Sequence, residues 1–243
     1  MNLKYNLIAH RGYFNLEKNI PENSIKAFKQ ALKYNYIIEF DVRMTKDKKL
    51  IVFHDDNLKR CCGIDKDIDE CSYDELKKLY LFSTTSKIPL FKEVLDIISG
   101  KVPIIIETKG KYKYGELEEL IEKELTNYEG EYAIQSFNPI SILWYKKNKP
   151  NIKRGLLESI KSKERLSLIQ RLLPLGCILK CDFYSLDKKL NIKKTNKPIL
   201  GWTIRTKEEY DTYKDKYYNI ICENMNLYIK EDENGTKRRN TKK

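Results

Sequence analysis

Eight short segments rich in β-branched and aromatic residues recur along the chain, and segments with a helical spacing of apolar residues separate most of them. Strands that alternate with helices pair in parallel, and eight such strands close a barrel. The sequence therefore predicts an α/β fold, a single-domain (β/α)8 TIM barrel. The expected strands are residues 6–10, 36–42, 103–108, 131–137, 153–158, 177–182, 198–204 and 218–223. The expected helices are residues 24–33, 115–127, 140–147, 163–173 and 207–214.

The chain length agrees with one barrel domain. The protein has 243 residues, and a barrel of this type typically needs roughly 250. Residues 50–54 form an additional expected strand, which would make a small β-hairpin with the second strand through a turn at residues 46–49. We expect residues 1–230 to form the barrel. Residues 231–243 are rich in Lys and Arg and have no apolar anchor, which predicts a basic, disordered C-terminal tail.

The composition indicates a globular protein without a membrane-spanning segment. Hydrophobic residues make up 41% of the chain, and no apolar run approaches the roughly 18 residues that a membrane helix needs. Residues 1–8 lack the apolar stretch of a signal peptide, and no CxxC pair occurs among the six cysteines. We therefore expect a cytoplasmic protein with free thiols.

The net charge of +12 has more than one interpretation. A positive field attracts an anionic small molecule or an anionic membrane surface, and it also promotes solubility without any partner. Peripheral contact with a membrane is therefore compatible with the sequence. Specific binding of nucleic acid is not expected, because the sequence contains no recognisable nucleic-acid motif.

Carboxylates occur near the ends of the second and third expected barrel strands. Glu39 and Asp41 are two residues apart, so their side chains point the same way, and Glu107 belongs to the next barrel strand. In barrels of this type the chemistry gathers at the C-terminal ends of the strands. Buried carboxylates repel one another unless a cation lies between them or nearby Arg and Lys side chains pair with them. Such a set of oxygen ligands suits Mg²⁺, Ca²⁺ or Mn²⁺ better than Zn²⁺.

His10 and His54 are the two histidines of the chain, and each lies at the end of an expected strand. Imidazole has a pKa near neutral pH, so a pair of histidines can both accept and donate a proton. Asp55 follows His54, but in a regular strand its side chain points to the opposite face, so we do not expect it to orient that imidazole. Together with the carboxylates, the histidines suit metal-assisted hydrolysis of a phosphate ester.

The order and spacing of several motifs resemble the glycerophosphodiester phosphodiesterase family, over residues 8 to about 224. One departure lies at the end of the eighth strand, where Cys222-Glu223-Asn224 replaces the usual Thr-Asp followed by Pro, which leaves local packing and specificity open there. The similar motifs are His10-Arg11-Gly12, Pro21-Glu22-Asn23-Ser24, Glu39-Phe40-Asp41-Val42, His54-Asp55 with Arg60, Ile88-Pro89-Leu90, Ile106-Glu107-Thr108-Lys109, Gln135-Ser136-Phe137 and Gly201-Trp202-Thr203.

The resemblance implies a barrel enzyme that hydrolyses glycerophosphodiesters to an alcohol and glycerol 3-phosphate. It also implies a divalent metal ion, Mg²⁺ or Ca²⁺ with Mn²⁺ as an alternative, and a small-molecule substrate. The sequence does not assign which histidine is the acid and which is the base. The implied roles are general acid and base for His10 and His54, metal ligands for Glu39, Asp41 and Glu107, and phosphate binding for Arg11 and Lys109.

Four further residues are candidates for the substrate pocket, namely Glu22, Gln135, Phe137 and Trp202. Glu22 has an alternative role before a helix, whose N-terminus favours an acidic residue, with Asn23 or Ser24 as the cap. Phe137 is more typical of a pocket wall than of a catalyst. Trp202 ends the seventh strand, where it would contact either a ligand or the core.

Three functions remain open from the sequence. The favoured one is a metal-dependent glycerophosphodiesterase. The second is a related barrel phosphodiesterase that acts on lysophospholipids or other phospholipids. The third is a non-catalytic protein that binds anions or nucleic acid through its net charge and its basic tail.

Overall fold

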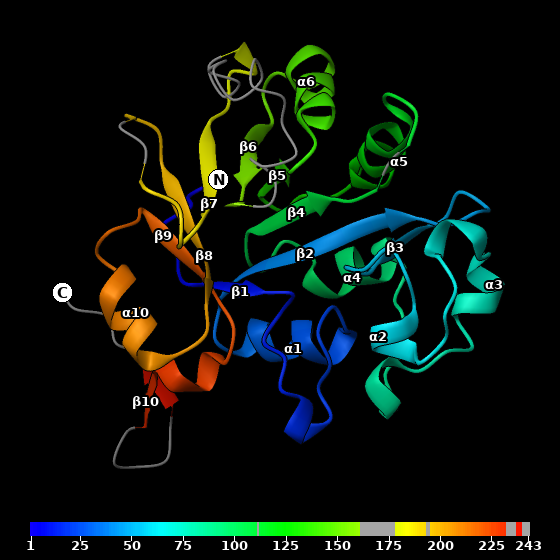
Figure 1. The fold of residues 1–243 in the computed structure, drawn as a ribbon, viewed down its shortest axis with the longest axis horizontal. Coiled ribbons are helices and arrows are strands. Elements are labelled where there is room, and N and C mark those ends of the chain that lie inside the picture. Colours follow the sequence, from blue (N-terminus) through cyan, green and yellow to red (C-terminus); the bar gives the residue numbers. More distant parts are fainter. Residues whose placement is uncertain (111, 161–177, 193–194, 232–236, 240–243) are drawn as a thin grey trace.

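A closed parallel barrel forms the centre of the molecule. The computed structural model describes residues 1–110, 112–160, 178–192, 195–231 and 237–239. Neighbouring barrel strands pair in parallel, and β1 pairs with both β9 and β2, so the sheet closes on itself. Figure 1 shows the helices around this barrel, which confirms the predicted (β/α)8 class. The barrel strands are β1 (Ile8–His10), β2 (Ile37–Met44), β4 (Ile104–Thr108), β5 (Tyr132–Ser136), β6 (Lys153–Glu158), β7 (Phe183–Asp187), β8 (Ile199–Ile204) and β9 (Asn219–Cys222).

Helices cover the outside of the barrel, and polar side chains start several of them. Ser24 caps the first by accepting a hydrogen bond from the backbone N–H of Ala27, and Asn138 and Thr206 cap two others in a similar way. Four of the predicted helices are confirmed, and the one predicted at residues 163–173 lies outside the described residues. The helices are α1 (Ile25–Lys33), α4 (Phe91–Ile98), α5 (Glu116–Leu125), α6 (Pro139–Asn148) and α10 (Lys207–Tyr213).

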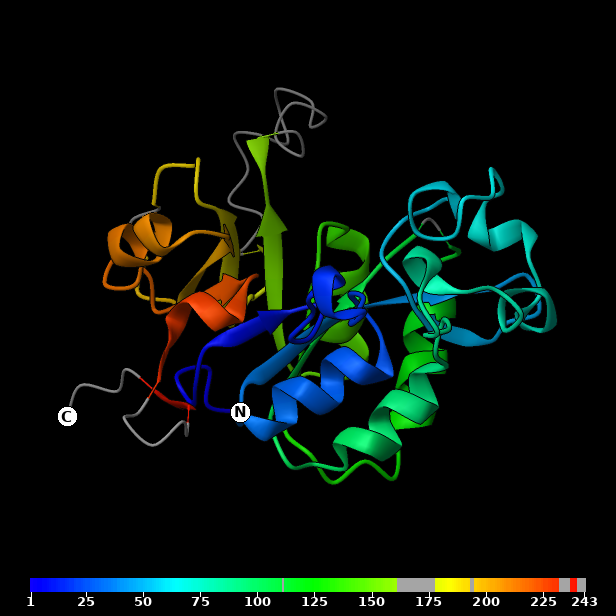
Figure 2. The ribbon, with the colours of Figure 1, turned by 90° about the horizontal axis from the view of Figure 1, so that it is seen from below.

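An insertion between β2 and α4 has a small core of its own. The strand β3 (Leu50–Val52) pairs antiparallel with the end of β2, which confirms the predicted hairpin. The segment that follows buries residues such as Phe53 and Ile68 away from the main core, and Figure 2 shows it extending to one side of the barrel. Its short helices are α2 (Lys59–Cys62), η2 (Ile68–Glu70), α3 (Tyr73–Leu76) and η3 (Leu81–Ser83).

The sixth barrel strand differs from the prediction. The sequence predicts it at residues 177–182, but the structure has β7 at Phe183–Asp187, and Leu179 and Lys180 lie in a turn. The alternation of side chains between the inner and outer faces of a barrel strand explains the difference. Phe183 packs inside the barrel, whereas Tyr184 and Leu186 pack with the outer core, so the later segment has the two faces that a barrel strand needs.

The interior of the barrel is apolar at its N-terminal end. This inner cluster includes Ile37, Ile105 and Phe183, which are fully buried. The Phe183 ring fits because its neighbour on β6 is Gly155, where a Cβ atom would lie 2.2 Å from that ring. Two residues further along β2 and β4 the inward-facing positions become Glu39 and Glu107. The fold therefore places a charged layer above an apolar one.

Four short elements lie outside the barrel and the insertion. Two are the 3-10 helices η1 (Leu16–Lys18) and η4 (Met225–Tyr228), and two are the paired strands β10 (Ile229–Glu231) and β11 (Lys237–Arg239). The antiparallel pairing of β10 with β11 involves part of the predicted tail; residues 232–236 and 240–243 lie outside the description. Within the described part of the chain, the cysteines are free and no helix is long and apolar enough to span a membrane.

Candidate active site

A cavity of about 120 Å³ opens at the C-terminal ends of the barrel strands. Most of the residues singled out from the sequence line it. Asp41 and Glu22 do not line it, but both form ion pairs with Arg11, which does. The cavity is lined by His10, Arg11, Glu39, His54, Glu107, Lys109, Gln135, Phe137, Leu157, Trp202, Thr203, Arg205 and Ile221.

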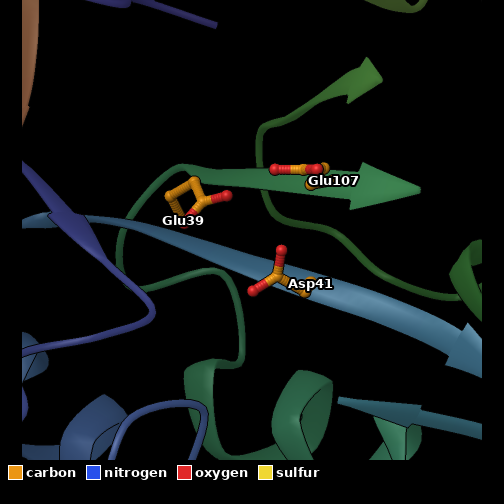
Figure 3. A group of neighbouring side chains, drawn as sticks. All are labelled: Glu39, Asp41 and Glu107. Carbon is orange, nitrogen blue, oxygen red and sulfur yellow. The ribbon is translucent and has the colours of Figure 1, made fainter. Parts of the chain in front are cut away.

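Three buried carboxylates converge in this site. Glu39 and Asp41 extend from β2 and Glu107 from the adjacent β4, and one oxygen of each lies within 4.8 Å of the others (Figure 3). Strand pairing brings them together, because Asp41 is directly opposite Glu107 in the ladder. Their residues are at most 5% exposed. Such a concentration of negative charge is costly to bury without compensating cations.

The three carboxyl groups differ in their pKa values. Burial, reinforced by the charges of Asp41 and Glu107, raises the pKa of Glu39 well above its ordinary value. Burial also raises the pKa of Glu107, although Lys109 opposes the effect. Burial alone would raise the pKa of Asp41 too, but Lys109 and other positive groups hold it far below its usual range. The neighbouring basic groups therefore stabilise the ionised form of Asp41, but not fully those of Glu39 and Glu107.

These residues fit a divalent cation. Their donor atoms are all carboxylate oxygens, which suits Mg²⁺, Ca²⁺ or Mn²⁺. Asp41 Oδ1 is buried and lies 3.4 Å from Lys109 Nζ, but it accepts no hydrogen bond from the described residues, so it can still serve as a ligand atom. Asp41 Oδ2, by contrast, accepts a hydrogen bond of 2.9 Å from the side chain of Asn23, which fixes the carboxylate plane.

Arg11 and Lys109 bring positive charge to the same cavity. Lys109 Nζ lies 2.6 Å from Glu107 Oε1 and 3.4 Å from Asp41 Oδ1. Arg11 adopts φ = 55°, a conformation that is uncommon for a residue with a side chain. In this position its backbone N–H donates to Glu39 Oε2, and its buried Nε donates no hydrogen bond to the described residues. Both cations can therefore contact an anion that enters the cavity.

Glu22 fixes the guanidinium of Arg11 and does not line the cavity. Its Oε1 accepts hydrogen bonds from Arg11, at 2.6 Å, and from Arg60, at 2.8 Å. The sequence motif contained Arg60 without a role for it, and the structure links it to this carboxylate. Ser24, two residues after Glu22, is the N-cap of α1. Glu22 is therefore a buried ion-pair partner of Arg11 and Arg60, and a role for it in the substrate pocket stays a prediction.

Each histidine is paired with a carboxylate through Nδ1. His10 Nδ1 lies 2.8 Å from Glu223 Oε1, and His54 Nδ1 lies 2.6 Å from Asp55 Oδ1. The expectation that Asp55 points away from His54 is wrong, because β3 ends at Val52 and both residues follow in irregular chain. Burial, followed by the positive charge of Arg11, lowers the pKa of His10.

A neutral hydrogen-bond chain lies beside Glu39. Gln135 donates from Nε2 to Glu39 Oε1 at 3.1 Å, and Ser185 donates to Gln135 Oε1 at 2.8 Å. Because Ser185 occupies the amide oxygen, the amide nitrogen is directed at the carboxylate. The sequence prediction included Gln135 but missed Ser185, which lay outside the expected sixth strand.

One wall of the cavity is apolar. The rings of Phe137 and Trp202 meet edge to face with centroids 5.7 Å apart, and Leu157 and Ile221 line the cavity as well. The Lys109 ammonium lies 5.8 Å from the centre of the Phe137 ring. An apolar portion of a substrate can therefore pack next to the charged centre.

The chemistry of the cavity suits an enzyme that hydrolyses phosphate esters, since positively charged side chains that could bind phosphate oxygens lie beside imidazoles that could transfer protons. The chain matches the model of the glycerophosphoryl diester phosphodiesterase family over residues 10–221. It therefore belongs to this family and is a phosphoric diester hydrolase. The non-catalytic alternative considered from the sequence is wrong.

Two relatives and one solved structure illustrate the similarity. The chain is 33% identical over 229 residues to a glycerophosphodiester phosphodiesterase of Caldanaerobacter subterraneus subsp. tengcongensis, which covers 86% of this chain and 89% of that protein. It is 33% identical over 115 residues to the lysophospholipase D GDPD1 of Homo sapiens, 42% of this chain and 35% of that protein. A phosphodiesterase of Oleispira antarctica, solved with sn-glycerol-3-phosphate, has the same fold, with a TM-score of 0.75, 22% identity and coverage of 89% and 92%.

Proposed function

We propose that the protein hydrolyses glycerophosphodiesters to an alcohol and glycerol 3-phosphate with the help of a divalent metal ion. The observation that carries this proposal is the juxtaposition of three buried carboxylates with two imidazoles at one cavity. Glu39, Asp41 and Glu107 would hold the ion. When bound, it would act as a Lewis acid that stabilises negative charge on the phosphate oxygens.

Arg11 and Lys109 would bind the non-bridging phosphate oxygens. Arg11 Nε is buried and lies 3.4 Å from Asp41 Oδ2, but it donates no hydrogen bond to the described part of the chain, so it can still donate one to an incoming oxygen. The guanidinium is held on its other side by Glu22, at 2.6 Å, which limits its rotation. Fixed cations of this kind stabilise the charge that grows on the phosphate in the transition state.

His10 and His54 would transfer the protons. One imidazole takes a proton from the attacking hydroxyl, either of water or of the substrate, as the new phosphorus–oxygen bond forms. The other, protonated, gives a proton to the leaving alcohol as its bond to phosphorus breaks. Each Nδ1 is already paired with a carboxylate, so Nε2 is the nitrogen that remains for the substrate. Proton transfer of this kind contributes about 10²–10⁴-fold in rate.

The test is release of glycerol 3-phosphate from glycerophosphocholine and glycerophosphoethanolamine. Wild-type protein would be assayed with Mg²⁺, Ca²⁺, Mn²⁺ or a chelator, beside His10→Ala, His54→Ala and the exposed control Glu208→Gln. We expect glycerol 3-phosphate release to depend on the metal ion and on both histidines. The control variant Glu208→Gln should release it as the wild type does. Release that continues in the chelator and in both histidine variants would refute the proposed mechanism.

A lysophospholipid is the second candidate substrate, because part of the cavity wall is apolar. Large apolar side chains also lie exposed in the segments after four strands, among them Tyr114, Ile140 and Ile160, which are 53%, 54% and 41% exposed. Exposed apolar side chains that follow the barrel strands of a basic protein suit peripheral contact with lipid. Choline release from lysophosphatidylcholine that exceeds release from glycerophosphocholine would favour this candidate.

A further inference from the structure

Glu223 links the first and last strands of the barrel at the active site. It directly follows β9, 213 residues after His10 in the sequence, and the parallel pairing of β9 with β1 brings the two together. Glu223 Oε1 lies 2.8 Å from His10 Nδ1, and the two side chains are only 15% and 12% exposed. The contact is therefore largely shielded from water. In such surroundings a hydrogen bond to a charged group is stronger than in water.

Arg205 holds the other side of this carboxylate. Its Nε donates to Glu223 Oε2 at 2.8 Å, and its Nη2 donates to Glu223 Oε1 at 3.1 Å. Burial alone would raise the pKa of Glu223, but His10 and Arg205 bring it down to about 2. The carboxylate is thus ionised at neutral pH and accepts, rather than donates, the hydrogen bond with His10.

The second histidine has the same kind of support. His54 Nδ1 contacts Asp55, and Asp55 accepts a hydrogen bond of 2.6 Å from Arg60 Nε. The two imidazoles thus each have a carboxylate on Nδ1 and a guanidinium on that carboxylate. The two carboxylates differ in their position in the sequence. Asp55 is adjacent to His54, whereas Glu223 is 213 residues from His10. The repeated arrangement indicates that orientation of each imidazole matters to the site.

We propose that Glu223, held by Arg205, is the positioning residue of His10: it keeps the neutral imidazole protonated on Nδ1 and directs Nε2 into the cavity. This inference rests on the proposed function for its catalytic consequence, but not for the tautomer itself. Without an ionised acceptor at Nδ1, the proton can move to Nε2 and the ring can rotate, so that fewer molecules have a free Nε2 at the substrate.

The experiment uses the fact that the chain has two histidines. Nitrogen-15 NMR of the imidazoles distinguishes a protonated from an unprotonated ring nitrogen, and His54→Gln assigns the remaining signals to His10. Wild type, Glu223→Gln and Glu223→Asp would be compared at one mildly basic pH, at which His10 is neutral. The matched control is Glu208→Gln, which removes the same charge from α10, where Glu208 is fully exposed.

We expect His10 of the wild type to carry its proton on Nδ1, and Glu223→Gln to give a mixture or the Nε2-protonated form. In glycerophosphodiester hydrolysis kcat should fall on the order of 10–100-fold in Glu223→Gln, with KM nearly unchanged. Glu223→Asp retains the charge at a shorter reach and should recover part of kcat. Divalent-cation affinity should be unchanged in both variants, because Glu223 does not contact the carboxylate cluster.

Two results would overturn the proposal. One is a wild-type His10 with its proton on Nε2. The other is Glu223→Gln with the tautomer and kcat of the wild type. If the wild type releases no glycerol 3-phosphate from any diester tested, the proposed function fails, but the NMR comparison still decides the role of Glu223. If Glu223→Gln does not fold, the wild-type tautomer and the kcat of Glu223→Asp decide it instead.

Discussion

Replacing Glu39 by Gln separates the cost of the buried carboxylate cluster from the benefit of a bound cation. Glu39 is 1% exposed, and a raised pKa means that its ionised form destabilises the fold. The associated stability is fully present below the unfolded-state pKa, about 4.3, and is lost as the pH rises towards the folded-state pKa. Gln stays neutral at every pH. In the absence of a cation, E39Q should therefore be more stable than the wild type near neutral pH.

The magnitudes of the opposing contributions favour a more stable E39Q in the absence of a cation. Gln loses one of the two acceptors that Gln135 and the backbone of Arg11 now use, which costs about 1 kcal/mol. Each pKa unit removed is worth about 1.36 kcal/mol, and the pKa of Glu39 is raised well above its ordinary value. A cation that binds only the folded wild type adds about 2.7 kcal/mol at a hundredfold excess over Kd. For a chain of this size that corresponds to about 5–11 °C in Tm.

Thermal unfolding followed by circular dichroism provides the assay, in a chelator and with saturating Mg²⁺, Ca²⁺ or Mn²⁺. We expect E39Q to have the higher Tm in the chelator and the wild type to have the higher Tm with the ion. The exposed control E208Q should follow the wild type in both conditions. An ion-induced shift that is equal in E39Q and wild type would refute the cation site. A lower Tm for E39Q in the chelator would refute the argument from buried like charges.

Three further predictions follow from the packing and the charges. G155A places a Cβ 2.2 Å from the Phe183 ring and should cost about 1–3 kcal/mol in urea unfolding, but less in an F183L background; equal costs would contradict the packing argument. Because burial lowers the pKa of His10, stability that wild type has relative to H10Q should be present above about pH 6.5 and decrease as the pH falls through it; denaturation midpoints that diverge the other way would contradict this. F137A and W202A should raise KM for a lysophospholipid more than for glycerophosphocholine, and equal increases in steady-state assays would argue against the lipid substrate.

Sequence patterns predicted those parts of the fold in which one rule dominates. The buried strands are strongly apolar and the helices are amphipathic, so strand and helix periods were distinguishable. The predicted position of the sixth strand is wrong because Ile178 and Leu179 precede Phe183 and Tyr184, so that two adjacent apolar segments have similar strand propensity. The choice between them depends on which segment fills the barrel beside Gly155, and that is a tertiary contact.

The site was predictable where residues share a strand, and not where partners come from elsewhere. Glu39 and Asp41 point the same way by strand geometry alone. Glu223 also lies at a strand end, so the same rule could have identified it, but no sequence pattern indicates that His10 is its partner. The prediction for Asp55 is wrong because it assumes a regular strand through His54, whereas β3 ends at Val52. Asn23, in a motif interpreted as a helix cap, contacts Asp41 instead.

The charges of the cluster explain why a cation and the substrate would belong together. Glu39, Asp41 and Glu107, when ionised, carry three negative charges, and Arg11 and Lys109 supply two positive ones, so this part of the site has a net charge of −1. A phosphodiester also carries one negative charge and would be repelled. A divalent ion changes the balance to +1, which attracts the diester, and does so in a buried site where electrostatic interactions are strong. The basic residues alone therefore do not account for an anion-binding site, and the acidic cluster is favourable for it only together with a cation.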